Sequence, residues 1–191
     1  MVSTSPLVKT YTLEEFWELP EPEDHSKLEL IAGVLYMTPP PGYLHNNSVS
    51  RLMRLLIDHQ TKTGDHGKLY VPRAGIVKGP NSWLEPDLFY VAADTKALSD
   101  PSYPQYFSTA DLVIEVISPS SAIYDRNTKA DTYAALGVKE LWLVDEVSGI
   151  IELRSLDGDQ YGPSLVFERD DYLKSVVLPG FEVKVGSVFG D

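Results

Sequence analysis

Two acidic residues, Asp87 and Glu115, stand at positions where carboxylates could do chemistry. Glu115 interrupts the apolar segment 111–118, which otherwise has the composition of a buried strand. A buried carboxylate is costly unless it is paired, protonated or bound to a metal, so Glu115 needs a partner. A structural salt bridge, or a strand end that faces solvent, is the alternative explanation.

Asp87 follows Pro86 and opens a second apolar segment, 88–92. The proline fixes the backbone at the mouth of this strand and so holds the next side chain in a defined direction. Adjacent strands run about 5 Å apart, so Asp87 and Glu115 could share one cation. Two carboxylates completed by water are a natural site for Mg²⁺, with Mn²⁺ as a substitute. A turn aspartate that caps backbone amides is the structural alternative.

The framework that positions Glu115 is a strand, a helix and a second strand. The strand at 111–118 is followed by a helix at about 121–136, which ends at Gly137, and then by an apolar strand at 140–144. This order predicts a parallel pair buried on both faces. The helix has a predicted inward stripe and a flank of longer side chains: Ile123, Ala130 and Ala134 on the stripe, and Arg126, Lys129 and Tyr133 on the flank.

Shorter elements surround this unit. A capping box at Thr12 predicts a helix to about Leu19, two strands turn at Ala32-Gly33, and a longer helix covers about 43–61. Residues 94–107 read as a surface loop. The C-terminal part predicts β-hairpins, with strands at 151–156, 164–168, 175–178 and 182–185. No boundary or repeat interrupts the chain, so we expect one domain, 1–191.

Composition limits the classes of protein that fit. The chain has 191 residues, 43% of them hydrophobic, which is enough for a substantial core. The absence of cysteine excludes disulfides and fits a reducing cytoplasm, and no apolar stretch approaches the ~20 residues of a membrane helix. The net charge of −12 argues against a protein that grips phosphates through its whole surface. On charge alone, an acidic surface that keeps the protein soluble is the simpler interpretation.

Several common motifs are absent from the sequence. There is no P-loop, G-x-G-x-x-G, H-E-x-x-H or G-x-S-x-G, so we expect no small-molecule organic cofactor. The histidines lack metal-ligand spacing. His45 faces inward on its predicted helix, and we interpret it as a hydrogen-bonded core histidine rather than a base.

Short motifs follow one another in a fixed order from about Thr12 to Phe189. They are Glu29-Leu30-Ile31 with Gly33, the prolines 39–41 before His45, Glu85-Pro86-Asp87-Leu88, the segment 111–120, Asp125, Lys129 and Tyr133, the segment 137–145, and Leu178-Pro179-Gly180-Phe181. Each motif is weak alone. In this order they resemble the Uma-two family of restriction-endonuclease-like proteins, within the PD-(D/E)XK nuclease superfamily.

The resemblance implies a restriction-endonuclease-like α/β fold, with a mixed sheet of about five strands flanked by helices and β-hairpins at the C-terminus. It implies metal-dependent endonuclease cleavage of DNA, with Asp87 and Glu115 as metal ligands and Glu29 as the acidic residue that completes the site. An exposed carboxylate in a hairpin is the alternative for Glu29. A homodimer would suit the cutting of two strands.

One position departs from the family pattern. Ile117 stands where the motif has its lysine, and Lys129 on the following helix is the expected substitute. A surface pair of Lys129 with Asp125 is the alternative. In the implied mechanism Lys129 orients or helps to deprotonate the attacking water, while Arg126 and Tyr133 hold substrate phosphates.

Two other classes of function remain open. One is a non-catalytic binding or regulatory protein on the same fold, which the acidic surface favours. The other is a carboxylate-pair enzyme such as a glycoside hydrolase. That enzyme would need an aromatic platform, and Trp17, Trp83 and Trp142 are dispersed in the sequence.

Overall fold

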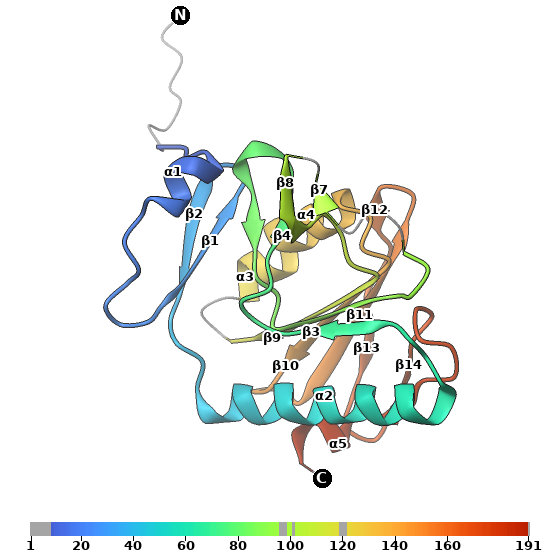
Figure 1. Ribbon diagram of the computed structural model, residues 1–191. Coiled ribbons are helices and arrows are strands. Elements are labelled where there is room, and N and C mark those ends of the chain that lie inside the picture. The colour runs from blue at the N-terminus through green and yellow to red at the C-terminus, as the bar shows by residue number, and fades with distance from the viewer. Residues whose placement is uncertain (1–8, 96–98, 101, 119–121, 191) are drawn as a thin grey trace, which may run out of the picture.

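The computed structural model describes residues 9–95, 99–100, 102–118 and 122–190. Within these ranges the larger of two mixed sheets has seven strands (Figure 1). They are β3 (Lys68–Tyr70), β6 (Leu88–Val91), β9 (Leu112–Ile117), β10 (Glu140–Asp145), β11 (Ile150–Asp157), β12 (Gln160–Tyr161) and β13 (Leu165–Phe167). Their order is β12-β11-β10-β9-β6-β3, and β13 pairs with β11.

The predicted strand-helix-strand unit forms the centre of this sheet. β9 and β10 are parallel, with Glu115 opposite Leu143. The crossover contains α3 (Ala122–Tyr124), a π-helical turn at Asp125–Lys129 and α4 (Ala130–Ala135). Gly137, at φ +78°, follows the helix in the left-handed conformation that glycine favours, as expected for a C-terminal cap.

A smaller sheet lies against the outer part of this unit. Its order is β2-β1-β5-β4-β8-β7, from β1 (Lys27–Ile31), β2 (Val34–Thr38), β4 (Ile76–Val77), β5 (Trp83–Leu84), β7 (Ser99–Asp100) and β8 (Tyr103–Phe107). β1 and β2 turn at Ala32 and Gly33, which both have positive φ. A 3₁₀ turn at Gly79–Asn81 precedes β5, and α1 (Leu13–Trp17) begins at the predicted capping box of Thr12.

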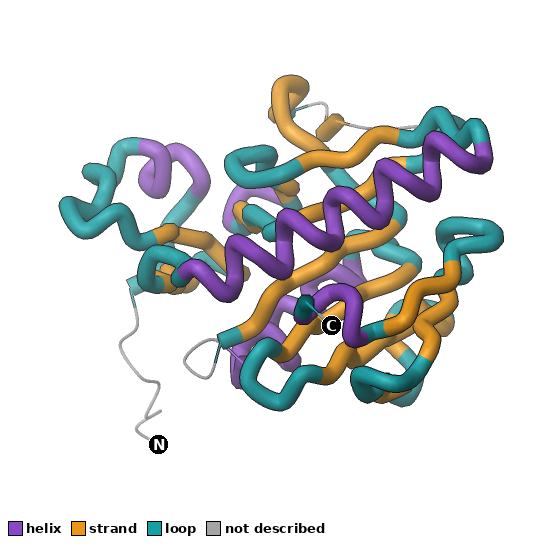
Figure 2. The backbone as a smooth tube through the Cα atoms, turned by 90° about the horizontal axis from the view of Figure 1, so that it is seen from below, coloured by secondary structure: helices purple, strands orange, loops and turns teal. Residues whose placement is uncertain are grey.

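Helix α2 (Tyr43–Thr63) lies across one face of the larger sheet, beside α5 (Gly186–Phe189) (Figure 2). The hairpin of β14 (Tyr172–Lys174) and β15 (Glu182–Lys184) packs into the same core. Ile114 and Val116 of β9 face this side, whereas Val113 and Ile117 belong to the core on the opposite face, with Tyr133 of α4. Alternation along the strand therefore directs Glu115 toward α4 and the smaller sheet.

The α/β fold with a mixed sheet, flanking helices and C-terminal hairpins is confirmed, and the sheet is wider than the five strands expected. Residues 94–107 are not only a loop, because β7 and β8 lie there and β8 pairs with β4. The prediction of a strand at Ser175–Leu178 is wrong. The hydroxyl of Ser175 accepts bonds from the backbone of Val177 and Leu178, which holds a turn instead.

The predicted inward stripe of the crossover helix is also wrong at its first position. Ile123 is 80% exposed, whereas Ala130 and Ala134 are buried as expected. The π-helical turn between them shifts the phase of the helix and brings Asp125 and Lys129 inward. Within the described part of the chain, no helix has the length and hydropathy needed to span a membrane.

Candidate active site

The structure brings Asp87 and Glu115 together, as their positions in the sequence predict. Leu88 pairs with Ile114 in the antiparallel β6–β9 ladder, so the next position of this register sets Asp87 opposite Glu115. Asp87 Oδ2 accepts a 2.8 Å hydrogen bond from the backbone N–H of Val116. Both carboxylates are buried, at 8% and 2% exposure, in a protein interior where an unpaired charge is costly.

Lys129 supplies the charge that Glu115 requires. Its Nζ lies 3.0 Å from Glu115 Oε1, 2.9 Å from Glu29 Oε2 and 3.3 Å from Asp125 Oδ1. The side chain is 2% exposed. The alternative of a solvent-exposed pair between Lys129 and Asp125 therefore does not apply, because that pair exists but is buried among further carboxylates.

Ile117 lies on the same face of β9 as Glu115, two residues further along the strand. Its side chain is buried in the apolar core beside Ala130 and Tyr133. The ammonium group beside Glu115 thus comes from the helix after the strand rather than from the strand itself. The predicted substitution of Lys129 for a lysine at position 117 agrees with this geometry.

Glu29 comes from β1 and is fully buried, so the alternative of an exposed hairpin carboxylate does not apply. Its Oε1 accepts a 2.9 Å hydrogen bond from the backbone N–H of Glu85. Lys27, two residues earlier on the same strand, has its Nζ 3.7 Å from Glu29 Oε2 and donates to the carbonyl of Glu85. β1 therefore contributes one carboxylate and one ammonium group to the site.

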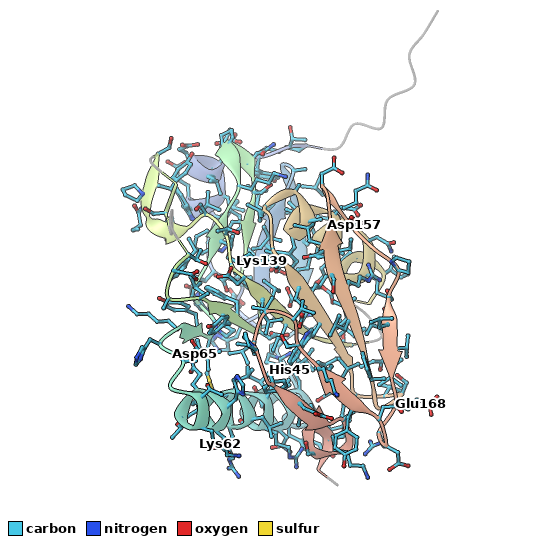
Figure 3. The ribbon with its side chains drawn as sticks, turned by 90° about the vertical axis from the view of Figure 1, so that its right-hand side faces the viewer. His45, Lys62, Asp65, Lys139, Asp157 and Glu168 are labelled. Atoms are coloured by element: carbon cyan, nitrogen blue, oxygen red, sulfur yellow. The ribbon has the colours of Figure 1, made fainter. Side chains whose placement is uncertain are left out.

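His45 contacts the site directly, which sequence analysis did not anticipate. Its Nε2 lies 3.1 Å from Asp87 Oδ2. The side chain is 19% exposed, so the interpretation as a hydrogen-bonded histidine is right but its placement in the core is not. Figure 3 labels His45 on the sheet side of α2 and Lys62 on the outer side. The inward helical phase and the preceding prolines were the available signals.

Arg126 and Tyr133, the predicted phosphate contacts, bond to other side chains of the protein. Arg126 donates from Nε to Glu152 Oε1 at 2.7 Å and from Nη2 to Asp145 Oδ2 at 3.3 Å. Tyr133 is fully buried behind Glu115 and donates a 2.6 Å hydrogen bond to its Oε1. Their side-chain positions give no support to a role in holding substrate phosphates. Tyr133 instead helps to fix the carboxylate of Glu115.

The charges of the site are unevenly compensated. Burial raises the pKa of Glu115 to about 7, despite the nearby Lys129. Burial also opposes the charges of Asp87 and Lys129, but the His45 hydrogen bond keeps the pKa of Asp87 below its usual value, and Glu115 and Glu29 raise the pKa of Lys129. Lys129 is therefore protonated in this arrangement. Lys129 contacts three carboxylates and Lys27 also pairs with Glu29, yet Glu115 has a raised pKa whereas the pKa values of Glu29 and Asp87 are lowered.

A cavity of about 830 Å³ opens onto these residues. Asp87, Glu115, Lys129 and His45 line one end, and aromatic side chains that include Trp17 and Trp83 line another part. Among the described residues, no group of three or more His, Asp or Glu side chains is arranged to hold a metal ion. A cation at this end would thus take its remaining ligands from water or from a substrate.

Comparisons with known proteins identify the family and the fold of the chain. The family Uma2, described as "Putative restriction endonuclease", matches residues 13–186. The crystal structure of "a putative nuclease belonging to DUF820 from Anabaena variabilis ATCC 29413" superposes with a TM-score of 0.75 at 18% identity, over 94% of this chain and 97% of that one. This likeness shows a shared fold. No curated protein matches the chain. On the family match, the protein belongs to the Uma2 family of restriction-endonuclease-like proteins.

Proposed function

We propose that this protein is a metal-dependent endonuclease that hydrolyses DNA phosphodiester bonds at the end of the cavity formed by Asp87 and Glu115. One observation carries the proposal. The ammonium group of Lys129 lies 3.0 Å from Glu115, although the position on β9 where the family motif has its lysine is occupied by Ile117. The acidic pair and a lysine thus meet in space without the usual spacing in sequence. Membership of the Uma2 family supports the same chemistry.

The two carboxylates fit a hard divalent cation such as Mg²⁺ or Mn²⁺. The contacts described for Asp87 use Oδ2, and those described for Glu115 use Oε1. Both residues line the cavity, and their second oxygens, Asp87 Oδ1 and Glu115 Oε2, are the ligands that we propose for the cation. Burial is the main cause of the raised pKa of Glu115, and the positive charge of a bound cation would oppose this effect.

When bound, such a cation would polarise a phosphoryl oxygen and lower the pKa of a water molecule. The protein's own residues provide orientation and charge around it. His45 and the Val116 N–H fix the carboxylate of Asp87. Lys129 stays protonated, so it stabilises negative charge that develops on the phosphate, and the proton of the attacking water passes to the surrounding solvent.

A cleavage assay tests the proposal. Supercoiled plasmid and a labelled oligonucleotide are incubated with the protein in Mg²⁺, in Mn²⁺ and in EDTA. We expect cleavage only with metal, and a loss of about 100-fold or more in Asp87→Asn and Glu115→Gln. Glu168→Gln, an exposed carboxylate labelled in Figure 3, is the matched control and should cleave normally. Equal trace activity in all four proteins would contradict the proposal.

A glycoside hydrolase is the second candidate, and one observation favours it. Trp17 and Trp83 are distant in sequence, yet their ring centroids lie 6.1 Å apart and both line the cavity. An aromatic platform beside a carboxylate pair also suits a sugar. Release of reducing ends from soluble polysaccharides, with no cleavage of DNA, would favour this candidate. A non-catalytic protein would show neither activity.

A further inference from the structure

The cavity has an aromatic end that the proposed hydrolysis does not use. Phe16 and Trp17 of α1, Trp83 of β5 and Tyr106 of β8 line it, together with Pro20 and Pro22. The four aromatic residues come from α1 and the smaller sheet, whereas Glu115 belongs to the larger sheet and Asp87 immediately precedes its strand β6. One continuous cavity therefore joins a carboxylate end to an aromatic end.

Trp17 is the part of this aromatic end that remains open. Three aromatic rings contact its indole. The ring centroids lie 6.1 Å away for Trp83, 5.5 Å for Tyr103 and 5.3 Å for Tyr106, and the angles between the ring planes are 84°, 73° and 36°. These neighbours hold the indole in place, yet Trp17 remains 38% exposed. A large aromatic side chain that is braced, partly exposed and part of a cavity wall is suited to stack against a flat ligand.

Polar groups also line the cavity. Glu85 lines the cavity, accepts a 3.0 Å hydrogen bond from Trp83 Nε1, and its backbone groups bond Glu29 and Lys27. Lys27 and Arg73 also line the cavity. Arg73 pairs with Glu21, and both side chains are largely exposed. Because an exposed ion pair contributes little free energy, Arg73 can leave Glu21 and bind a phosphate at small cost.

We propose that the aromatic end binds an unpaired nucleobase by stacking on Trp17, so that the substrate is single-stranded or locally unpaired DNA. This inference rests on the proposed nuclease function and narrows its substrate. A base inside a duplex has both faces covered by its neighbours and cannot stack on a protein ring. Stacking on aromatic side chains is the usual way in which proteins hold single strands.

The net charge of the protein and the volume of the cavity also favour a single-stranded substrate. A net charge of −12 is unsuited to tracking the dense phosphates of a duplex over a wide surface. A cavity of about 830 Å³ suits a ligand of nucleotide size. Arg73, whose partner Glu21 is largely exposed, is the cavity-lining cation available to a phosphate beside the stacked base, whereas Lys27 is engaged by Glu29 and the carbonyl of Glu85.

Binding without turnover tests the inference. Fluorescence anisotropy is measured in EDTA with a labelled single-stranded 12-mer and with the same sequence as a blunt duplex, using the full-length protein. We expect the single strand to bind about tenfold or more tightly than the duplex. Trp17→Leu keeps an apolar side chain without a π face and should weaken single-strand binding about tenfold, whereas Trp17→Phe should stay within about threefold. Tyr172→Ala removes an exposed aromatic residue outside the cavity lining and should change nothing.

The outcomes separate this inference from the proposed function. Equal binding by Trp17→Leu and Trp17→Phe, tighter binding of the duplex, or competition by oligosaccharide but not by single-stranded DNA would each overturn the inference. If DNA is nevertheless cut through Asp87 and Glu115, the nuclease proposal stands without it. Binding that depends on Trp17, in a protein that cuts no DNA, supports the base site and removes the nuclease proposal. Thermal melting of each variant shows that the compared proteins are folded.

Discussion

Lys129 Nζ lies 3.0 Å from Glu115 Oε1 and 2.9 Å from Glu29 Oε2, and so connects the two mixed sheets. Glu115 belongs to the larger sheet and Glu29 to the smaller one. This buried ammonium group bridges the two sheets beside an apolar core that both of them share. Structure and proposed chemistry depend on the same side chain.

Replacing Lys129 by Met is expected to impair both. Removal of one partner from a buried ion pair leaves an uncompensated charge and costs about 3–5 kcal/mol of unfolding free energy. Cleavage should fall about 100-fold because the charge that stabilises the phosphate is lost. Urea denaturation and the plasmid assay measure the two effects.

The double variant Ile117→Lys/Lys129→Met restores a lysine on the same face of β9 as Glu115. Its cleavage activity should be at least about tenfold higher than that of Lys129→Met. No recovery would show that the origin of the ammonium group matters as much as its charge.

His45→Gln should weaken metal binding while the fold remains intact. The imidazole orients the Asp87 carboxylate through its 3.1 Å contact, and loss of such supporting groups lowers metal affinity about 10–100-fold. Calorimetric titration with Mn²⁺ measures the affinity directly. His66→Gln, an exposed position outside the cavity lining, is the control and should match the wild type. An unchanged affinity of His45→Gln for Mn²⁺ would show that His45 does not support the metal site.

Arg126→Ala distinguishes a structural residue from a phosphate ligand. The guanidinium bonds Glu152 and Asp145 at 2.7 and 3.3 Å, so its loss should lower the unfolding free energy by about 1–2 kcal/mol. Because Arg126 does not line the cavity, KM for DNA should remain within about twofold of the wild type. A large rise in KM, with the unfolding free energy unchanged, would support Arg126 as the phosphate contact predicted from the sequence.

Asp111 should contribute to stability except in acid. Burial opposes its charge, but Lys139 at 2.7 Å, Thr95 and the Ala92 N–H together lower its pKa below the usual value. A carboxylate with a lowered folded-state pKa stabilises the protein above its unfolded pKa of ~3.9, and this contribution is lost as the pH falls through the lower folded value.

The Asp111→Asn variant tests this dependence. It should be less stable than the wild type by about 1–3 kcal/mol at pH 7, and the difference should shrink below about pH 4. Denaturant unfolding at pH 7, 5 and 3 measures it. A difference that stays constant over this range would mean that Asp111 acts through packing rather than charge.

The sequence predicted the strands of the site better than its helix. The isolated Glu115 in an apolar segment and Pro86 before Asp87 reveal two adjacent strands, because alternation and proline constraints are local. The π-helical turn at Asp125–Lys129 is not visible in a pattern read at 3.6 residues per turn. It turns Ile123 outward and Lys129 inward, and thereby decides which charges meet.

Contacts between the two sheets could not be predicted from local patterns. Glu29 reads as a hairpin carboxylate until β1 pairs with β5 and buries it. Trp17 and Trp83 are far apart in the sequence and come together only through the smaller sheet. The same long-range packing places His45 at the end of β6, on Asp87. Tertiary arrangement, rather than residue type, distinguishes these groups from ordinary surface residues.

Anomalous scattering from a crystal of the protein soaked with Mn²⁺ locates the ion without assuming activity. We expect a peak in contact with carboxylate oxygens of both Asp87 and Glu115, with Lys129 still paired to Glu115. The peak should disappear in Asp87→Asn crystals soaked in the same way. No peak between the two carboxylates at millimolar Mn²⁺, or one that persists unchanged in Asp87→Asn, would contradict the metal site and the nuclease mechanism built on it.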